Sequence, residues 1–462
     1  MNKNMRIAFL VAVLAALLTA VVTSMTLAEI RKDRFLDIRE IKTPAGITVW
    51  FFEDHTLPIV AVNFAFAGAG TINDPPEKQG LAKMLSNTLD EGAGDLDSRA
   101  FQKELADHSI GFGFSASRDH FSGSMKFLSR EKTRAFDLLA LALTKPRFDD
   151  DAIQRMRDAN IVRIRSSLTD PDWRAARIMN DRAYEGHPYA MNSGGTVSGL
   201  QSITGDDLRS FLKDNITRDR LLVAVAGDLS EAEAKAFIDS AFSGLPAQSA
   251  GKKPENISIR NTGKTFLMKN DSPQTIIMMA QDGIDRTDPD WYAAQIMNFI
   301  LGSSGFGSRL MEEVREKRGL TYGIYTSLDT QDHARSISLS TSTRNEKTAE
   351  MLELIRAEWV KMRDADITED ELTTAKSYIT GSMPLALSST DRISGMMLSM
   401  MLDHLPSTYL DTLADKINAV TISDIRRVSG RILNPDTLLT VLVGMPQGTD
   451  NATIVETLPN VE

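Results

Sequence analysis

Short stretches of the chain alternate hydrophobic and polar residues, and longer stretches between them repeat hydrophobic residues every three or four positions. The first pattern is typical of half-buried strands and the second of amphipathic helices. In the first half, strands are predicted over residues 47–52 and 59–66, a hairpin over 111–128, and helices over 77–91, 98–110, 133–143 and 150–167.

The second half of the chain repeats this order of predicted elements. Strands are predicted over 265–268 and 275–280, helices over 289–301 and 308–318, a hairpin over 322–341, and further helices over 345–363 and 368–380. The ends of the two halves agree best, because residues 203–227 and 420–444 align without a gap. A repeat of this length indicates a duplicated domain and not a solenoid, whose units are about 20–50 residues long.

The patterns favour the α+β class, with helices covering an antiparallel-rich sheet in each half. We therefore expect two homologous lobes, residues 29–243 and 263–462. Residues 244–262 between them are small, polar and proline-containing, which is typical of a linker. Two lobes joined in this way are expected to face each other across a crevice, a common place for a ligand.

Composition narrows the range of partners. At 462 residues, with 42% hydrophobic and 25% charged residues, the chain has the make-up of a globular protein with more than one domain. Its formal net charge of -10 argues against nucleic acid or an anionic membrane surface as the main partner. The absence of cysteine excludes disulfides and thiolate metal sites.

Residues 1–28 differ in kind from the rest of the chain. Lys3 and Arg6 precede an apolar run over 7–22, and small residues end at Ala28, which is the pattern of a secretory signal peptide. We expect an exported, periplasmic protein with no membrane span once this segment is removed. The alternative is an uncleaved membrane anchor, although the apolar run is shorter than the ~20 residues of a comfortable span.

The stretch that best suggests chemistry is residues 301–324, LGSSGFGSRLMEEVREKRGLTYGI. A Gly/Ser loop over 302–308 precedes a short amphipathic helix, which Gly319 ends in the position of a left-handed cap. Leu320, Tyr322 and Ile324 then alternate with smaller residues, which predicts a half-buried strand.

Arg315 falls in the last turn of this helix, and Tyr322 falls just beyond it. The turn between them could bring both side chains to one edge, where Arg offers a fork of N–H donors and Tyr a hydroxyl donor to a carbonyl oxygen. The alternative is that Arg315 pairs with Glu312 or Glu316 on a solvated helix, while Tyr322 is half-buried core.

Together, the repeat and this stretch resemble the insulinase/pitrilysin family of zinc peptidases, in particular its short, bacterial, processing-peptidase-like members. The resemblance covers roughly residues 40–450, and GFGSRLMEEVREKRGLTYGI is similar to the family's second-lobe motif. His187-Pro188-Tyr189 is a further feature that the family often has.

In its first lobe, this family carries an H-x-x-E-H motif that binds zinc and activates water, with a third ligand on a later helix. In the matching segment, Lys83 stands at the first histidine, Ser86 at the glutamate and Asn87 at the second histidine, and the third ligand falls close to Arg163. A lysine ammonium repels Zn²⁺, and Ser and Asn replace neither an imidazole nor a general base. The six histidines include no pair three or four residues apart, so we expect no metal in this chain.

For the second lobe, the resemblance implies that Arg315 and Tyr322 hold the backbone carbonyl of a peptide and help to stabilise the oxyanion formed from it. It also implies that part of the loop contributes to substrate capture. The loop residues concerned are Gly302, Ser303, Ser304 and Gly305.

A chain with the Arg/Tyr pair and without the zinc site is predicted to be the non-catalytic, substrate-binding subunit of an exported heterodimeric zinc metallopeptidase acting on peptides. The zinc is then expected in a homologous partner subunit. The alternative is a catalytically inert structural or peptide-binding envelope protein with the same fold. A hydrolase with a different site is a third possibility, but no G-x-S-x-G, P-loop or dinucleotide motif supports it.

Overall fold

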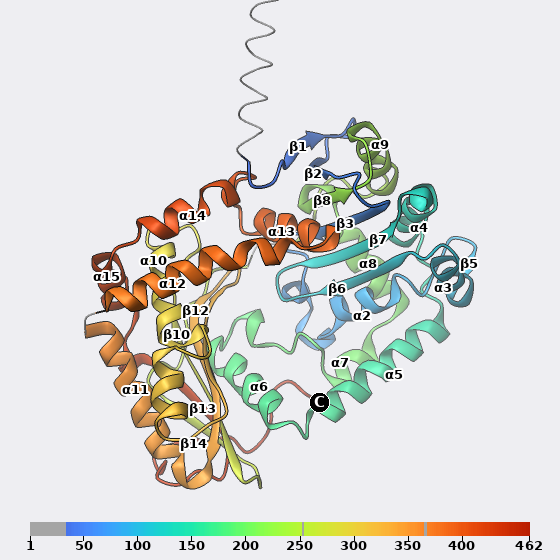
Figure 1. Cartoon of the computed structure of the whole chain (residues 1–462). Coiled ribbons are helices and arrows are strands. Elements are labelled where there is room, and N and C mark those ends of the chain that lie inside the picture. Colours follow the sequence, from blue (N-terminus) through green and yellow to red (C-terminus); the bar gives the residue numbers. More distant parts are fainter. Residues whose placement is uncertain (1–33, 252–253, 365–366) are drawn as a thin grey trace, which may run out of the picture.

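The computed structural model describes residues 34–251, 254–364 and 367–462, so the segment 1–28 expected to be a signal peptide lies outside the described residues. Two six-stranded sheets, each covered by helices, form two lobes that lie side by side (Figure 1). This arrangement confirms the predicted α+β class and the two-lobed architecture.

The first sheet has the strand order β1-β2-β8-β3-β7-β6. Its strands are β1 Arg39–Lys42, β2 Thr48–Glu53, β3 Ile59–Phe66, β6 Gly111–Ala116, β7 Phe121–Leu128 and β8 Leu221–Gly227, and β4 Gly92–Ala93 and β5 Leu96–Asp97 form a separate small hairpin. The helices of this half of the chain are α2 Leu81–Thr88, α3 Ser98–Asp107, α4 Lys132–Thr144, α5 Asp150–Ser167, α6 Pro171–Ala183, α7 Val197–Ser202, α8 Gly205–Asn215 and α9 Glu231–Phe242.

The second sheet has the strand order β11-β12-β10-β13-β9-β14. Its strands are β9 Thr265–Lys269, β10 Gln274–Asp282, β11 Ile324–Thr330, β12 Arg335–Arg344, β13 Leu439–Gly444 and β14 Thr453–Ile454. The helices of this half are α10 Trp291–Asn298, α11 Thr348–Asp364, α12 Glu369–Ser382, α13 Thr390–Leu402, α14 Tyr409–Ala419 and α15 Ile422–Ile432.

Five strands of each sheet share one topology, as the repeat in the sequence predicts. β8 pairs parallel with β2 and antiparallel with β3, and β13 pairs parallel with β9 and antiparallel with β10. In each lobe a hairpin, β6–β7 or β11–β12, continues the sheet on the other side of β3 or β10. The hairpin's outer strand, β6 or β11, therefore forms one edge of its sheet.

Each half of the chain lends one helix to the sheet of the other half. α6 comes from the first half but packs on β13 and β10, where Ala175 and Ile178 join a core that includes Val441 (Figure 1). α13 comes from the second half but packs on β3 and β8, where Met397 joins a core that includes Ala224. The sequence patterns singled out neither helix, because nothing local marks which sheet a helix covers.

Polar contacts also join the two lobes. The hydroxyl of Tyr189 donates to the carboxylate of Asp119 and accepts the backbone N–H of His333 at 3.1 Å. The backbone N–H of Asp332 donates to the same carboxylate at 3.3 Å. Tyr189, from the His-Pro-Tyr feature of the sequence, thus lies at the lobe junction. A cavity of about 710 Å³ remains between the lobes, lined by residues of both.

The described residues of 244–262 run between the lobes without a helix or strand. Within them, the N–H of Ile257 donates to the His333 carbonyl and the N–H of Arg260 to the Ala183 carbonyl, each at 2.8 Å. This segment is therefore tied to both halves. In the parts of the chain that the structure describes, no helix combines the length and apolar character needed to cross a bilayer.

Candidate functional site

Helix α2 carries the residues that stand at the expected zinc-binding positions. Ser86 is 2% exposed and its hydroxyl donates to the Lys83 carbonyl at 2.8 Å, so its hydrogen bond stays within the helix. The Asn87 side-chain oxygen accepts an N–H from Asn160 of α5 at 3.3 Å, and Asn160 accepts an N–H from Arg163 at 3.1 Å. The structure therefore brings Asn87 and Arg163 to one contact between α2 and α5, with Asn160 between them.

The charges at this contact oppose a metal cation. Partial burial, together with the positive charge of Arg163, lowers the pKa of Lys83. Two cationic side chains thus stand where zinc would need imidazole, thiolate or carboxylate ligands, and this donor set does not fit the ion. Across the described residues, no group of three or more His, Asp or Glu side chains is arranged to hold a metal ion.

The motif of the second lobe starts with a short helical segment whose turn Met311–Glu316 is π-helical. Such turns insert one residue into a helix and occur frequently at functional sites. Leu310, Met311 and Val314 are buried in the core of the second lobe, as the amphipathic pattern predicts. Gly319, with φ +61°, ends the segment in the left-handed region that glycine tolerates, again as predicted.

Arg315 lies beside the Gly/Ser loop. Its guanidinium sits over the ring of Phe306, 4.3 Å from the centroid, and Nη1 lies 3.3 Å from Oε1 of Glu316. The ion pair between Arg315 and Glu316, which the alternative in the sequence analysis predicted, is thus present. A solvent-exposed pair of this kind contributes only about 0–1 kcal/mol to the free energy of unfolding. Arg315 keeps further N–H donors for a ligand, and the exposed Phe306 ring positions them by a cation–π contact.

Tyr322 points out of the protein and is 89% exposed. The predicted half-buried strand position is therefore wrong, since β11 begins only at Ile324. The hydroxyl of Thr321 donates to the Gly323 carbonyl at 2.9 Å and accepts the Gly323 N–H at 3.1 Å. The hydroxyl of Thr341 donates to the same carbonyl at 2.8 Å. These contacts fix a turn that competes with the strand and holds Tyr322 on its outside.

The predicted capture loop begins inside a second π-helical turn, Phe299–Ser303. Gly302 is buried, and a Cβ at this position would lie 2.7 Å from the Thr326 hydroxyl, so this glycine lets the loop pack closely on β11. The rest of the predicted set is at least partly exposed, namely Ser303, Ser304 and Gly305.

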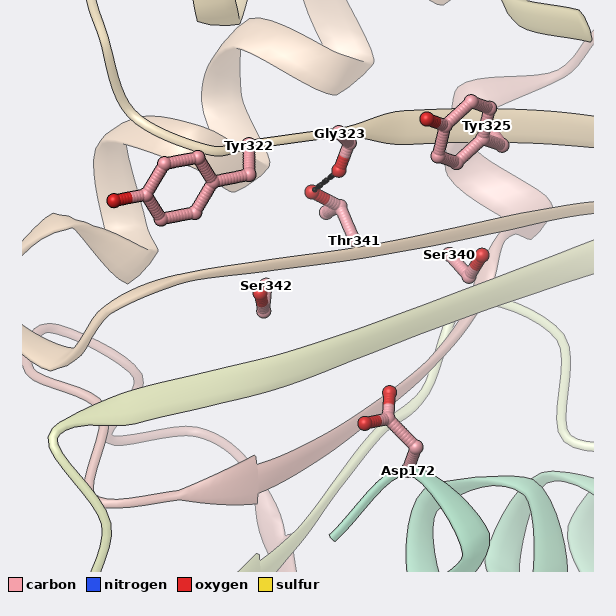
Figure 2. Close-up of a pocket in the computed structure, with 7 residues that line it drawn as sticks. All are labelled: Asp172, Tyr322, Gly323, Tyr325, Ser340, Thr341 and Ser342. Carbon is pink, nitrogen blue, oxygen red and sulfur yellow. Dashed lines mark hydrogen bonds between the residues drawn. The ribbon is translucent and has the colours of Figure 1, made fainter.

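Tyr322 also borders an open pocket of about 350 Å³. Figure 2 shows Tyr325 of β11 and Ser340 and Ser342 of β12 on one side of it and Asp172 of α6 on the other. Partial burial, and then the nearby charge of Asp170, raise the pKa of Asp172. The pocket thus combines hydroxyls and aromatic rings of the second lobe with a carboxylate of the first half.

Of the residues around this site, the sequence pattern identified Arg315, Tyr322 and the loop. It missed Phe306, Tyr325 and Asp172. Phe306 lies within the recognised motif, so an aromatic ring beside a functional Arg was a signal available in the sequence. Asp172 gave no such signal, because its helix reaches the site only through the exchange between lobes.

The arrangement can bind an oxygen atom of a ligand, because a guanidinium and a phenol both donate hydrogen bonds. Among the described residues no hydrogen bond joins Arg315 to Tyr322, so neither side chain occupies the donors of the other.

Comparisons with known proteins point to one family. Residues 53–195 match the family described as insulinase (peptidase family M16), and residues 202–379 match the peptidase M16 inactive domain. A crystal structure described as a peptidase M16 inactive domain from Pseudomonas fluorescens is similar, with a TM-score of 0.83 and 30% sequence identity. The match covers 89% of this chain and 98% of that one.

Two relatives carry names that differ in what they say about activity. The "Non-peptidase homolog YmxG" of Helicobacter pylori is 25% identical, over 82% of this chain and 88% of its own length. The "Uncharacterized zinc protease YmxG" of Bacillus subtilis is 23% identical, over 86% of this chain and 96% of its own length.

Proposed function

The chain belongs to the insulinase family, peptidase family M16, as an inactive-type member, and we propose that it is the non-catalytic, substrate-holding subunit of a heterodimeric zinc peptidase. In this complex a homologous partner carries H-x-x-E-H and zinc. This chain supplies Arg315 and Tyr322, which hold a backbone carbonyl of the peptide beside the partner's metal.

The observation that carries the proposal is the exposure of Tyr322 on a turn that three hydrogen bonds fix. A large aromatic side chain held in solvent gains no burial energy, and exposed apolar groups that gather at one place mark interaction sites. Phe306 and Tyr325 are also exposed in the same part of the second lobe. These exposed side chains are therefore available to bind a second molecule.

The extensive contacts between the two lobes support the proposal that the zinc site belongs to a second molecule. α6 and α13 each cross to the opposite sheet, and Tyr189 ties the junction by hydrogen bonds. Tyr322 is exposed on this interlocked body, in a pocket that it shares with Asp172 of α6. A metal centre that meets Tyr322 is thus most simply supplied by a partner that docks over the second lobe.

The proposal includes export to the periplasm, which rests on the signal-like residues 1–28 alone. A partner with the same destination is expected to carry a similar leader.

The test is peptide hydrolysis with zinc present, measured for this chain alone, for an H-x-x-E-H homologue from the same genome alone, and for the equimolar mixture. We expect activity in the mixture that exceeds the sum of the two separate chains. Arg315→Ala and Tyr322→Phe in this chain are each expected to lower kcat of the mixture by about 10²–10³, the usual cost of one oxyanion donor.

The matched control is Arg427→Ala, which removes an exposed Arg of the same half on α15, where it contacts Asp290 and Asp424 and does not line the pocket beside Tyr322. It should leave the activity of the mixture unchanged. A homologue that is equally active without this chain would contradict the proposal.

The second candidate is an inert scaffold or peptide-binding protein of the same fold. The observation that favours it is the contact of Arg315 with Glu316 and Phe306, which gives this side chain partners within the chain. In that case the two substitutions together should change neither the activity of any homologue nor peptide binding.

A further inference from the structure

Four polar side chains of the first lobe meet where helices α2 and α5 pack on each other (Figure 1). Lys83 and Asn87 are four residues apart on α2, and Asn160 and Arg163 are three residues apart on α5, so each pair lies on one face of its helix. The hydrogen bonds from Asn160 to Asn87 and from Arg163 to Asn160 join these two faces. After burial, the charge of Arg163 is the second cause of the lowered pKa of Lys83, so the ammonium lies near the guanidinium.

The two cations of this contact lack a counter-ion. Within the described ranges, neither Lys83 nor Arg163 forms an ion pair with an Asp or Glu side chain. By contrast, Arg155 of the same helix pairs with both Glu91 and Asp151. Because Lys83 is partly buried, water screens the repulsion between the two like charges less than it would at the surface. A bound anion would relieve this repulsion.

The contact also offers hydrogen-bond donors that the described chain does not use. The Lys83 ammonium has no acceptor there, and the Arg163 guanidinium donates only from Nη1, to Asn160. The Asn87 oxygen accepts from Asn160, which leaves the N–H groups of the Asn87 amide without an acceptor. Lysine and arginine side chains carry donors and no acceptors, so the three groups together suit an oxyanion.

The same residues are held in place and remain accessible. Asn160 is 3% exposed, and its side chain bonds both Asn87 and Arg163. Arg163 is exposed, and Lys83 and Asn87 are partly exposed, so a ligand in solution can reach all three. The position at which the family binds a metal cation therefore has the opposite electrostatic character in this chain.

We propose that Lys83, Asn87 and Arg163 bind a carboxylate group of the peptide. The inference rests on the proposed function for the peptide as the carrier of the carboxylate, but it concerns the other lobe and residues other than Arg315 and Tyr322. The ammonium of Lys83 neutralises the negative charge, and the amide of Asn87 and the guanidinium of Arg163 donate hydrogen bonds to the carboxylate oxygens. The C-terminus of a peptide and an acidic side chain both present this group.

The test measures peptide binding to the full chain alone by isothermal titration calorimetry. All peptides have one neutral background and an acetylated amino end. The first two differ only in a free or an amidated carboxyl end, and a second pair, both amidated, carries Glu or Gln at one scanned position. We expect the free-acid peptide, or the Glu peptide at one position, to bind about tenfold tighter than its neutral counterpart, the scale of a hydrogen bond to a charged group. The pair that shows the gain identifies the source of the carboxylate.

Lys83→Met and Arg163→Gln are each expected to remove most of this gain, whereas Lys83→Arg, which keeps the charge, should retain much of it. Arg163 is exposed, so its substitution tests the site even if Lys83→Met impairs folding. Arg165→Gln is the matched control, because it removes the same charge from an exposed position of α5 two residues away, on another face of the helix. It should leave the ratio of affinities as it is in the unaltered chain.

Equal binding of the acidic and neutral peptides in both pairs would overturn the inference. So would a gain that survives Lys83→Met and Arg163→Gln, or one that Arg165→Gln lowers equally, since net charge would then explain it. If the gain is absent but the mixture with the zinc-bearing homologue cleaves peptides and Arg315→Ala stops it, the inference fails and the proposed function stands. If the mixture cleaves nothing but the gain depends on Lys83 and Arg163, the proposed function fails and the carboxylate site stands.

Discussion

The carboxylate of Asp74 organises the start of α2, the helix at the lost zinc site. It accepts backbone N–H groups from Gly80 at 2.8 Å and Ala82 at 2.9 Å, in a helix that has no side-chain cap of its own. Burial raises the pKa of Asp74 to about 7, although the N–H contacts favour the charged form and act in the opposite direction. Asp74 thus caps the start of α2, but its burial disfavours the charged form of its carboxyl group.

The raised pKa of Asp74 predicts that the stability of the protein depends on pH. A carboxyl that binds its proton more tightly in the folded protein than in the unfolded chain favours folding at low pH. We expect the contribution of Asp74 to the free energy of unfolding to fall as pH rises from about 4 to about 7, by on the order of a few kcal/mol. Denaturant unfolding at about pH 5 and about pH 8, for the unaltered chain and for Asp74→Asn, measures it. The variant cannot ionise at this position, so equal pH differences in both proteins would contradict the expectation.

At the scale of elements, α12 supports the segment that carries Arg315. The hydroxyl of Thr368 accepts the Glu371 N–H at 3.2 Å, and the Glu371 carboxylate accepts the Thr368 N–H at 2.9 Å, which forms a capping box. The same carboxylate binds Arg309 through two N–H bonds of 2.6 and 2.9 Å. The Glu371 side chain therefore both caps α12 and binds the segment that carries Arg315.

Thr368→Ala is expected to lower the free energy of unfolding by about 1 kcal/mol, the usual cost of losing a Ser or Thr cap. It should also speed amide hydrogen exchange in the first turn of α12, because Glu371 loses one of the contacts that position it. Thr380→Ala is the control, since its hydroxyl donates only to a carbonyl of its own helix. Equal effects of the two substitutions on exchange at the start of α12 would contradict a role for the cap.

At the scale of the whole molecule, the exchange of α6 and α13 makes each lobe part of the other's core. Ile178 of α6 and Met397 of α13 are both fully buried against a sheet from the opposite half. Neither lobe can therefore unfold and leave the other with a complete core, although chains with two domains often unfold in separate steps.

We expect a single unfolding transition that tryptophan fluorescence, far-UV circular dichroism and calorimetry all report at the same midpoint. Tryptophan probes both halves, because Trp50 and Trp173 lie in the first and Trp291 and Trp359 in the second. Ile178→Ala should lower the free energy of unfolding by about 2–5 kcal/mol and move the whole transition, and Met397→Ala should do the same from the other side. Two transitions, of which a substitution moves only one, would show that the lobes are independent.

Much of the fold and part of the site could be predicted from local patterns. Strand β7 and helix α5 follow from alternation and helical spacing, which depend on residues at most a few positions apart. The loss of zinc ligands at Lys83, Ser86 and Asn87 follows from the resemblance to the family's motif together with the chemistry of these residues. Alternation failed at Tyr322, where hydrogen bonds of Thr321 and Thr341 to Gly323 outweigh the strand pattern.

By itself, the sequence determined the order of elements and the duplication and, with the family resemblance, the absence of zinc-binding residues from α2, because these features can be read from the order of the residues without knowing which residues touch. Only the tertiary structure decided that α6 and α13 change lobes, that Tyr322 faces solvent, and that Asp172 meets Ser342 in one pocket. The physical reason is that these features depend on which distant surfaces bury each other, and burial is a property of the whole packed chain.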